Sequence, residues 1–575
     1  MPDRQWIKKS VDKKLVRTIA DTHSCDTLTA YILASRGITD DEEIRRFLGD
    51  DDCPLCDPFM LPGIAEAIQR IRQARTGNEK ILIFGDRDVD GITGTALLVD
   101  YLKCLDIVVS WRIPVEDEPY GLSIQVVDDF SARGGTLIIT VDCGISNIAE
   151  IARAGELGVD VIVTDHHVPK EVLPQALTIA NPKLHGSAYP FPDIAGCMVA
   201  FKLVLALQAV LGDDGIVNFP QKENHYTQLV ALGTVADIVP LKSENRIVVR
   251  RGIKAMTKNP RYGLSELLVT LGLAGKRITA RELAWLVCPA INATGRMGCP
   301  DKALGLLLEA DPFVRMNLAR EVKAMNEKRK RLGAKSWPLI ERLACESVAL
   351  FDGKLAVAFG DGISRGITGI MANRLTERLG VPAMVAHLGC DIAIGSIRSP
   401  GNYDIRLLLG PMDDILLNWG GHANALGFSL RRSLWEQFID RLRIEVCFID
   451  CVDMPDDKPL VIDAELPHAY ITPDTFAVLD RFEPYGSGNE PIVFASNGLK
   501  IASLVPIGKH DPKHLKMTVD TGGCQWPAVF WNATDCAMTE IRAGDVVDMA
   551  YSFTYDSYRK VETPQLLVKE IRKSV

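Results

Sequence analysis

The chain has 575 residues, too many for one hydrophobic core, so three or four domains are expected. Hydrophobic residues make up 47% and charged residues 24%, as in an ordinary globular protein, and no apolar run approaches the roughly 20 residues that a membrane span needs. The net charge of −9 excludes a generally basic nucleic-acid coat, although it leaves room for a local basic groove.

The start of the chain and its cysteines point to a cytoplasmic protein. The stretch MPDRQWIKKSVDKK has no apolar signal core, and the 14 cysteines follow no repeating framework, which favours reduced thiols over disulfides. Cys53 and Cys56 have the spacing of a zinc knuckle, but no second pair of cysteines and no HxxxH lies nearby. This spacing therefore favours a structural accident over a metal site.

The first half of the chain is predicted to contain two domains. Residues 1–65 should form a helical N-terminal cap, because DTLTAYILASRGI and DDEEIRRFL have helical periodicity and an acidic first turn. In residues 66–245, the apolar strands ILIFGD, TLIITVD, VDVIVTDHH and LTIANP alternate with helical stretches or turns. This alternation predicts a parallel sheet.

The second half is predicted to contain three further segments. Residues 246–340 should form a helical connector, whose basic run REVKAMNEKRKRLGAK is best interpreted as a solvated helix face. A second α/β pattern begins at LAVAFGDG and covers residues 341–455. Residues 456–575 contain short strands such as HLKMTV and WPAVFWN with few helical signals, which predicts a small β-barrel.

The stretch KILIFGDRDVDG places three carboxylates, Asp86, Asp88 and Asp90, after a predicted strand. With Gly91, their spacing matches the opening of an EF-hand loop, but Leu97 stands where that loop needs a bidentate Glu. The apolar run before them also resembles a buried parallel strand and not an entering helix. A solvated acidic turn is the other alternative, although three clustered carboxylates repel one another when no cation is present.

Later segments carry the same kind of side chains to the same edge of the predicted sheet. Asp142 follows the strand LIITV, and Asp165, His166 and His167 follow VIVT, while Asp237 comes after a helical stretch of small residues. The carboxyl ends of parallel strands lie at one edge, so these groups can meet. Oxygen ligands with one imidazole suit Mn²⁺ or Mg²⁺, and two such ions about 4 Å apart can generate a hydroxide and stabilise a phosphoryl transition state.

The ordered motifs resemble a known family. GDRDVDG, VDCG, TDHH and GTVADIVPL stand in the order of the four motifs of the DHH phosphoesterases. With PAINATGRMG, GITGIMANRL, GSIRS, GGHANALGF and EPYGSGNEP, the series resembles the RecJ single-strand-specific exonucleases over nearly the whole chain. The resemblance implies a DHH catalytic domain at 66–245, a DHH-associated substrate-binding domain at 341–455 and an OB-type nucleic-acid-binding barrel at 456–575.

The resemblance also implies a two-metal centre. Its predicted ligands are Asp88, Asp90, Asp142, His166 and Asp237. Asp142 would bridge two Mn²⁺ or Mg²⁺ ions, and Asp237 would complete the coordination of the second.

Three neighbouring side chains would support this centre. His167 would lie close enough to contact the scissile phosphate, and Asp165 would orient a histidine, as carboxylates near metal sites often do. Together with Asp142, these two residues are the predicted catalytic groups. Asp86 would mainly support its loop and is a secondary candidate ligand.

The resemblance also implies seven candidates for holding the substrate: Asn292, Arg296, Ser396, Arg398, Gly420, Gly421 and His422. Paired glycines let backbone N–H groups approach a phosphate closely, and a planar guanidinium suits the same task. From spacing alone, the GGH segment favours a glycine-rich turn with a packed histidine. Its resemblance to the DHH-associated domain favours substrate binding instead.

The predicted barrel contains one basic segment and one aromatic segment. The basic group comprises Lys509, His510, Lys513, His514 and Lys516. The aromatic group comprises Trp526, Phe530 and Trp531. OB-type barrels bind single strands by stacking over a basic groove, but these aromatic residues are equally compatible with a barrel core.

Several positions depart from the RecJ pattern. Glu116 stands where an arginine is associated with the 5′ end, and Arg112 is the alternative cation for that role. Ala290 replaces another arginine, Ser364 replaces a histidine, and Phe84 stands where many members have a histidine. Selectivity for a 5′-terminal phosphate is therefore expected to be weak.

The resemblance implies a metal-dependent exonuclease that degrades single-stranded DNA from 5′ to 3′ in recombination and repair. We expect a monomer, with a single-strand-binding protein or a helicase as candidate partners. One alternative is a DHH phosphodiesterase of short oligonucleotides or cyclic dinucleotides, which would not need the terminal barrel. Another is a non-catalytic replisome scaffold related to RecJ, but the retained acidic and histidine residues argue against it.

Overall fold

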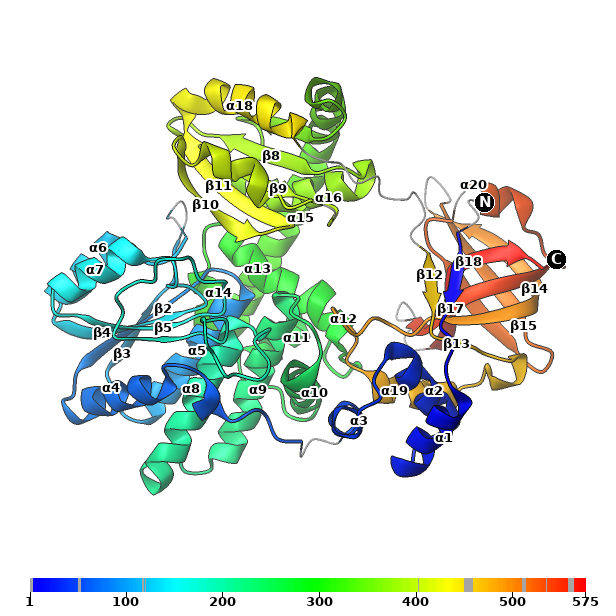
Figure 1. Ribbon diagram of the computed structural model, residues 1–575, viewed down its shortest axis with the longest axis horizontal. Coiled ribbons are helices and arrows are strands. Elements are labelled where there is room, and N and C mark those ends of the chain that lie inside the picture. The colour runs from blue at the N-terminus through cyan, green and yellow to red at the C-terminus, as the bar shows by residue number, and fades with distance from the viewer. Residues whose placement is uncertain are drawn as a thin grey trace.

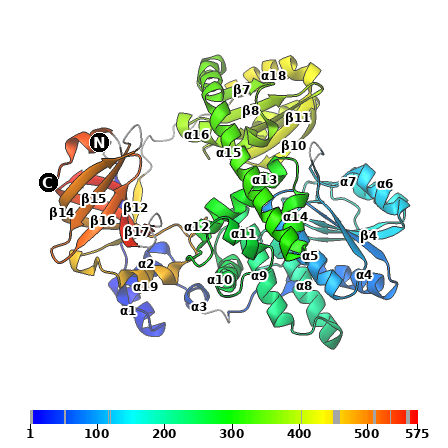
Figure 2. The same cartoon turned by 180° about the vertical axis from the view of Figure 1, so that it is seen from behind.

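The computed structural model describes most of the chain. The described residues are 4–49, 53–115, 118, 120–401, 403–448, 459–508, 513–533, 535–556 and 563–574. A parallel sheet with its helices, a second α/β lobe and a β-barrel surround a central group of helices (Figures 1 and 2). None of the helices in the described part has the length and apolar character of a membrane span.

The first α/β domain contains a five-stranded parallel sheet. Its order is β3 (Val109–Arg112), β2 (Lys80–Gly85), β4 (Gly135–Val141), β5 (Asp160–Thr164) and β6 (Thr178–Ala180). Side chains of the central strands alternate between two cores, with Ile81 and Ile83 on one face and Leu82 and Phe84 on the other. Because both faces are covered, these strands are almost wholly apolar.

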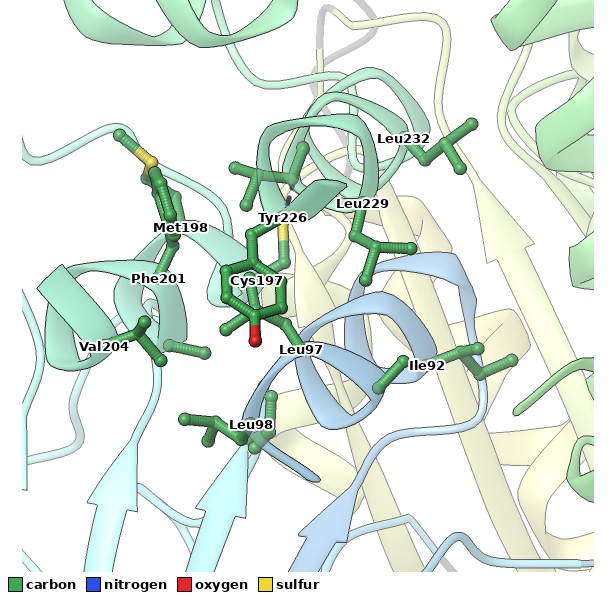
Figure 3. Packing of buried hydrophobic residues seen from close by; sticks show 14 of the residues in the cluster. Ile92, Leu97, Leu98, Cys197, Met198, Phe201, Val204, Tyr226, Leu229 and Leu232 are labelled. Atoms are coloured by element: carbon green, nitrogen blue, oxygen red, sulfur yellow. Dashed lines mark hydrogen bonds between the residues drawn. The ribbon is translucent and has the colours of Figure 1, made fainter. Parts of the chain in front are cut away.

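Helices cover both faces of this sheet. One face packs against α4 (Ile64–Thr76), α5 (Val89–Cys104) and α8 (Gly196–Leu211). The other face packs against α6 (Ile124–Ala132) and α7 (Ile148–Glu156). Figure 3 shows Leu97 of α5 close to Cys197 of α8 and to Tyr226 of α9 (Phe219–Ala236). This packing fixes the helix termini that lie nearest the carboxyl edge of the sheet.

The helical connector shares its core with the first domain. It comprises α10 (Ser243–Lys258), α11 (Leu264–Thr270), α12 (Ala280–Glu282), the π-helical turn η3 (Leu283–Val287), α13 (Cys288–Arg296), α14 (Asp301–Leu308) and α15 (Pro312–Val348). The basic run lies on α15, where Lys328, Lys330 and Arg331 are exposed. Because Trp337 and Ile340 of the same helix pack into the second lobe, α15 crosses the domain boundary expected at residue 340.

The second lobe contains a mixed five-stranded sheet. Its order is β10 (Leu416–His422), β11 (Ala425–Arg431), β9 (Ile392–Arg398), β8 (Ala383–Leu388) and β7 (Ala356–Gly360), in which only β7 and β8 pair in parallel. One face packs against α15 and α16 (Thr368–Leu379), and the other packs against α18 (Trp435–Cys447). The sheet thus separates two small cores.

The C-terminal strands close into a five-stranded barrel. These strands are β14 (Phe494–Ile507), β15 (His514–Asp520), β16 (Gln525–Phe530), β18 (Thr563–Lys573) and β17 (Val546–Asp556), and β17 pairs back with β14. β13 (Ala464–Glu465) adds to β14 at one edge. Closure leaves few exposed strand edges.

The N-terminal helices share the core of this barrel. Val16 of α1 (Lys13–Thr22), Leu33 of α2 (Thr27–Arg36) and Ile44 of α3 (Asp41–Leu48) belong to the same buried cluster as the barrel strands. In addition, β1 (Trp6–Lys8) pairs in parallel with β12 (Leu460–Ile462). Residues 4–49 therefore form one body with the barrel, whereas the sequence alone suggested a separate N-terminal cap over residues 1–65.

Cys53 and Cys56 lie in the linker that follows these helices. The backbone N–H of Cys56 donates to Glu244, and its carbonyl accepts from the buried Lys202. The carbonyl of Cys53 accepts from Arg251. These contacts fasten the linker to α8 and α10.

Candidate active site

The acidic residues converge at the carboxyl edge of the parallel sheet because the strands run in register. The backbone N–H of Asp86 donates to Val141, that of Asp142 donates to Thr164, and that of Asp165 donates to Ala180. The residue after each strand thus continues the ladder to its neighbour. Asp237 reaches the same edge from the C-terminal end of α9.

Two helix N-termini orient the carboxylates of the first motif. Asp88 caps α5 and accepts hydrogen bonds from the N–H groups of Asp90 and Gly91. Asp90 accepts from the N–H groups of Gly196 at 2.6 Å and Cys197 at 2.9 Å, at the start of α8. The unsatisfied N–H groups and the positive end of the helix dipole favour a carboxylate at such positions.

His166 lies at the centre of the remaining ligands. Its Nε2 is 3.1 Å from Oδ1 of Asp142, 3.7 Å from Oδ2 of Asp237 and 3.8 Å from Oδ2 of Asp90. Asp142 is almost fully buried and has a φ of 59°, a left-handed conformation that is costly for a residue other than glycine. Such strain occurs preferentially at functional sites.

Several buried polar atoms of this cluster form no hydrogen bond within the described part of the chain, although Nε2 of His166 and Oδ1 of Asp142 lie 3.1 Å apart. Oδ1 of Asp86, Oδ1 of Asp142 and both ring nitrogens of His166 have no hydrogen-bond partner among the described residues. Three groups have ligand atoms within 4.8 Å of one another: Asp142, His166 and His167; Asp90, His166 and Asp237; and Asp86, Asp88 and Asp142. Carboxylate oxygens with imidazole suit Mn²⁺ or Mg²⁺, so the residues present fit these ions.

The electrostatics of the cluster support the same interpretation. Burial and the Asp90 and Asp88 charges raise the pKa of Asp142 well above its usual range. Burial and neighbouring carboxylates raise the pKa values of Asp88 and Asp90 to about 6. Burial, with His167, lowers the pKa of His166 to about 3, so its ring is neutral and able to bind a metal. A cation among these carboxylates would offset their repulsion.

Asp165 holds the backbone of both histidines and the ring of His167. Its Oδ1 accepts from the backbone N–H groups of His166 and His167, and its Oδ2 accepts from Ile145. The same Oδ1 lies 2.8 Å from Nδ1 of His167. Burial lowers the pKa of His167, but the hydrogen bond and charge of Asp165 outweigh it and raise the value to about 9. Nδ1 is thus engaged, which leaves Nε2 for other contacts.

The GGH segment brings the second lobe onto this site. The ring of His422, at the end of β10, stacks on His167 with centroids 5.8 Å apart and planes 14° apart. Gly421 has a φ of 134°, and a Cβ there would collide with the carbonyl of Ala425. A Cβ at Gly420 would meet nothing within 4 Å. The candidates Gly420, Gly421 and His422 therefore lie at the junction of the two lobes.

Ser396 and Arg398 lie on β9, next to the N-terminus of α16. Oγ of Ser396 is 3.1 Å from Oγ1 of Thr368, the first residue of that helix. A Cβ at Gly369 would lie 2.8 Å from Nη2 of Arg398, so the guanidinium lies beside the first turn. A helix N-terminus, two hydroxyls and a guanidinium together suit a phosphate group.

The two candidates on α13 have different surroundings. Oδ1 of Asn292 accepts from the N–H of Val89, so this side chain holds the start of α5. Burial, Arg329 and Arg398 lower the pKa of Arg296 to about 10, which means that three guanidinium groups lie within electrostatic reach of one another. Arg296 thus belongs to a cationic group, whereas Asn292 mainly supports the acidic motif.

Sequence reasoning missed three side chains beside the site. Arg329 is one of several basic residues in the run on α15, and Thr368 lies within the segment GITGIMANRL, so neither stood out in the sequence. Burial, His167 and Lys183 lower the pKa of His422, so Lys183 lies within reach of the junction between the lobes. Its place after the NP turn that follows β6 was the available signal, because that turn lies at the same edge of the sheet.

The departures from the expected pattern have separate explanations. Glu116 lies outside the described residues, and Arg112 forms an ion pair with Glu118. Ala290 is fully buried in the core of the first domain, and Ser364 precedes a short 3₁₀ turn. Phe84 also packs in a core, on the face covered by α6 and α7.

The aromatic residues of the barrel divide into two groups. Trp526 is 5% exposed within the barrel core, and Phe530 packs against that core. Trp531 is 42% exposed, and its ring contacts His514 edge-on at 4.8 Å. Among the basic candidates, His514 and Lys516 lie on β15 and Lys513 directly precedes it, while Lys509 and His510 lie outside the described residues.

Comparison with known proteins identifies the domains. Residues 80–234 match the N-terminal domain of the DHH family, residues 352–446 match the DHHA1 domain, and residues 462–570 match the RecJ OB domain. These matches confirm the expected fold class of two α/β domains, a helical connector and an OB-type barrel.

Whole-chain comparisons agree with the domain matches. The single-stranded-DNA-specific exonuclease RecJ of Bacillus subtilis is 32% identical over 583 residues, which cover 98% of this chain and 70% of that protein. RecJ of Escherichia coli is 31% identical over 568 residues, 95% of each. The crystal structure of Thermus thermophilus RecJ with Mn²⁺ has a TM-score of 0.81 at 28% identity, covering 100% of this chain and 80% of that one. This chain belongs to the RecJ family.

Proposed function

We propose that this protein is a metal-dependent exonuclease that hydrolyses single-stranded DNA from the 5′ end towards the 3′ end, in recombination and repair. The observation that carries the proposal is the buried cluster of Asp90, Asp142, His166 and Asp237, in which Oδ1 of Asp142 and both ring nitrogens of His166 form no hydrogen bond with the described residues. Its relatives in the RecJ family are named single-stranded-DNA-specific exonucleases, which supports the substrate and the reaction type.

Asp88, Asp90, Asp142, His166 and Asp237 would hold two Mn²⁺ or Mg²⁺ ions, with Asp142 between them. When bound, such a pair of ions activates a water molecule and stabilises the charge that develops on the phosphoryl group. Asp86 would complete the carboxylate side of the site through the atom that lacks a partner.

Other side chains would hold the DNA backbone. His167, oriented by Asp165, would direct Nε2 towards the scissile phosphate. Ser396, Arg398 and Arg296 would bind the phosphates that follow, because a planar guanidinium can make two parallel hydrogen bonds to one phosphate. Gly420, Gly421 and His422 would close the site from the second lobe.

The domain arrangement supports a preference for single strands. We assign catalysis to the domain at 66–245, substrate binding to the domain at 341–455 and strand capture to the barrel. Single-strand specificity would arise at the junction where His422 stacks on His167, if the passage there admits one strand and excludes a duplex. We place the activity in the cytoplasm, where a single-strand-binding protein or a helicase would expose suitable strands to a monomeric nuclease.

Both alternative functions are less well supported. A phosphodiesterase of dinucleotides has no need for a barrel that matches the RecJ OB domain. A scaffold has no need for a buried cluster of carboxylates with raised pKa values.

Incubation of the purified protein with single strands labelled at either end tests the proposal. We expect degradation with Mn²⁺ or Mg²⁺ and none with a chelator. Early loss of the 5′ label as mononucleotide would show the proposed direction. Early release of the 3′ label, or cutting that continues with the metals removed, would contradict it.

A further inference from the structure

The barrel and the N-terminal helices are here called the barrel module, which comprises the described residues of 4–48 and 459–574. This module contacts Leu241, close to Asp237 in the first domain. The N–H of Leu241 donates to the carbonyl of Ser487 at 2.7 Å. A Cβ at Gly486 would lie 2.6 Å from Cδ1 of Leu241, so this approach depends on glycine. Leu241 is buried and lies only four residues after Asp237.

The segment between Asp237 and Leu241 contains one residue with a strained backbone. Ile238, directly after Asp237, has a φ of 60° and is 72% exposed. A β-branched residue rarely adopts this conformation, and it persists only where the surrounding structure holds it. Because its own side chain is exposed, the restraint must come from the neighbouring segments.

Two contacts supply that restraint. One is the hydrogen bond from Leu241 to Ser487 of the barrel module. In the other, Nδ2 of the buried Asn245 donates to Pro240 at 3.0 Å and also to Asp193 at 2.7 Å. Asp193 lies shortly before the start of α8, whose N–H groups hold Asp90. Asn245 thus joins the segments that carry two candidate ligands.

Arg246, the residue after Asn245 on α10, attaches this helix to the barrel module. The guanidinium of Arg246 donates to the carbonyls of Phe47, Phe482 and Arg481 at 3.1, 2.9 and 2.8 Å. It also lies 3.8 Å above the ring of Phe47. Arg246 is 2% exposed, so these carbonyls have little access to water as an alternative donor. The first turn of α10 therefore contacts both the segment that follows Asp237 and the barrel module.

We propose that the barrel module positions Asp237 through Gly486 and Ser487, so that the metal affinity of the centre depends on how this module is docked. The inference rests on the metal centre proposed above. Gly486, Ser487 and Arg246 belong to none of the groups of candidate metal ligands in the described residues, and we assign them a positioning role. Residues that orient metal ligands typically change metal affinity about 10- to 100-fold when mutated.

The test is a titration of the full chain with Mn²⁺ alone, followed by electron paramagnetic resonance, without DNA. Gly486→Val pushes Leu241 away, and we expect it to bind at least one ion about tenfold more weakly than the wild type. Gly523→Val is the matched control, because a Cβ at this barrel glycine meets nothing within 4 Å. Adding Leu241→Ala to Gly486→Val restores space and should recover much of the affinity.

Arg246→Lys tests the same coupling without altering the loop. It should also weaken Mn²⁺ binding, because lysine cannot reach all three carbonyls. A purely structural role would lower the unfolding temperature of these variants and leave Mn²⁺ affinity unchanged, which would overturn the inference. If Gly486→Val does not fold, unchanged affinity in a folded Arg246→Lys overturns it instead. If the wild type binds no Mn²⁺, the proposed centre itself is wrong and the inference falls with it.

Discussion

Asp142 is the single residue on which the candidate metal centre most depends. It belongs to two of the three groups of candidate ligands, and its Oδ1 has no hydrogen-bond partner among the described residues. The chain also holds it in a left-handed conformation directly after β4. A side chain placed between two groups of ligands in this way can bridge two ions.

Asp142→Ala should therefore remove nearly all nuclease activity. Loss of a bridging ligand should cost well over 1.4 kcal/mol of transition-state stabilisation, or more than about tenfold in rate. Initial rates on a labelled single strand measure this, with the exposed Asp129→Ala on α6 as the control. Asp86→Asn should do less harm. Retention of more than about a tenth of wild-type turnover by Asp142→Ala would contradict the bridging role.

Arg398 should contribute to the cleavage of single-stranded DNA whether the 5′ end carries a phosphate or a hydroxyl. Arg398→Ala should lower kcat/KM on 5′-phosphorylated and 5′-hydroxyl strands alike, and Arg398→Lys should recover only part, because an ammonium lacks the planar fork. The wild type should discriminate between the two strands by less than about tenfold, or 1.4 kcal/mol. A larger preference in matched initial rates would mean that another cation captures the terminal phosphate.

The sequence predicts part of this site because parallel strands end side by side. The register of β2, β4 and β5 brings Asp86, Asp142 and Asp165 together, as the strand pattern indicates. The local sequence could not show that Asn292 bonds to Val89 or that Arg329 approaches Arg296, because these contacts depend on how α13 and α15 pack.

At the scale of single elements, strand β16 and the turn that follows it place two tryptophans in different surroundings, because Trp526 is buried in the strand and Trp531 is exposed directly after it. Trp531→Ala should weaken binding of a long single strand by about 1–3 kcal/mol, because an exposed indole can stack on a base. Trp531→Phe should retain much of the affinity. Trp526→Ala should instead destabilise the barrel by about 3–5 kcal/mol, because it leaves a cavity in the core. Fluorescence anisotropy and thermal unfolding separate the two effects, and equal binding by Trp531→Ala and the wild type would exclude stacking there.

Glu483, at the end of α19 (Thr475–Phe482), should make stability depend on pH. Burial raises its pKa to about 7, above the value of about 4.3 in an unfolded chain. The folded state therefore holds this proton more tightly, and the stability that it contributes is lost as the pH rises towards and through 7.

Glu483→Gln should consequently be more stable than the wild type at about pH 8, with a much smaller difference at about pH 5. Denaturant unfolding followed by circular dichroism measures the gain. Glu436→Gln is the control, because this carboxylate is exposed. A gain of equal size at both pH values would show that the proton on Glu483 is not responsible.

Element types were easier to predict than their partners. Strong sequence signals come from the apolar runs of β2, β4 and β5 and from the helical period of α15. The short edge strand β3 is only partly buried, so its sequence carries no comparable apolar pattern. An amphipathic helix shows that one face is buried, but not against what. This is why the sharing of one core by α1, α2, α3 and the barrel could not be derived locally.

For the molecule as a whole, the shared core changes how the barrel can be studied. Deleting residues from about 456 onward should weaken binding of long strands more than cleavage of short ones, because stacking and phosphate contacts accumulate with length. The deletion would also expose apolar residues of α1, α2 and α3 to water. Point variants such as Trp531→Ala therefore separate binding from folding better than truncation.

The most direct test of the proposed function compares the initial rates at which the purified protein, in Mn²⁺, hydrolyses an end-labelled single strand, the matching duplex and a dinucleotide. We predict rapid cleavage of the single strand, little cleavage of the duplex, slower cleavage of the dinucleotide, and loss of all three activities in Asp142→Ala. Equal rates on single strand and duplex, or a dinucleotide cleaved fastest, would contradict a single-strand exonuclease. Undiminished cleavage by Asp142→Ala would contradict the metal centre itself.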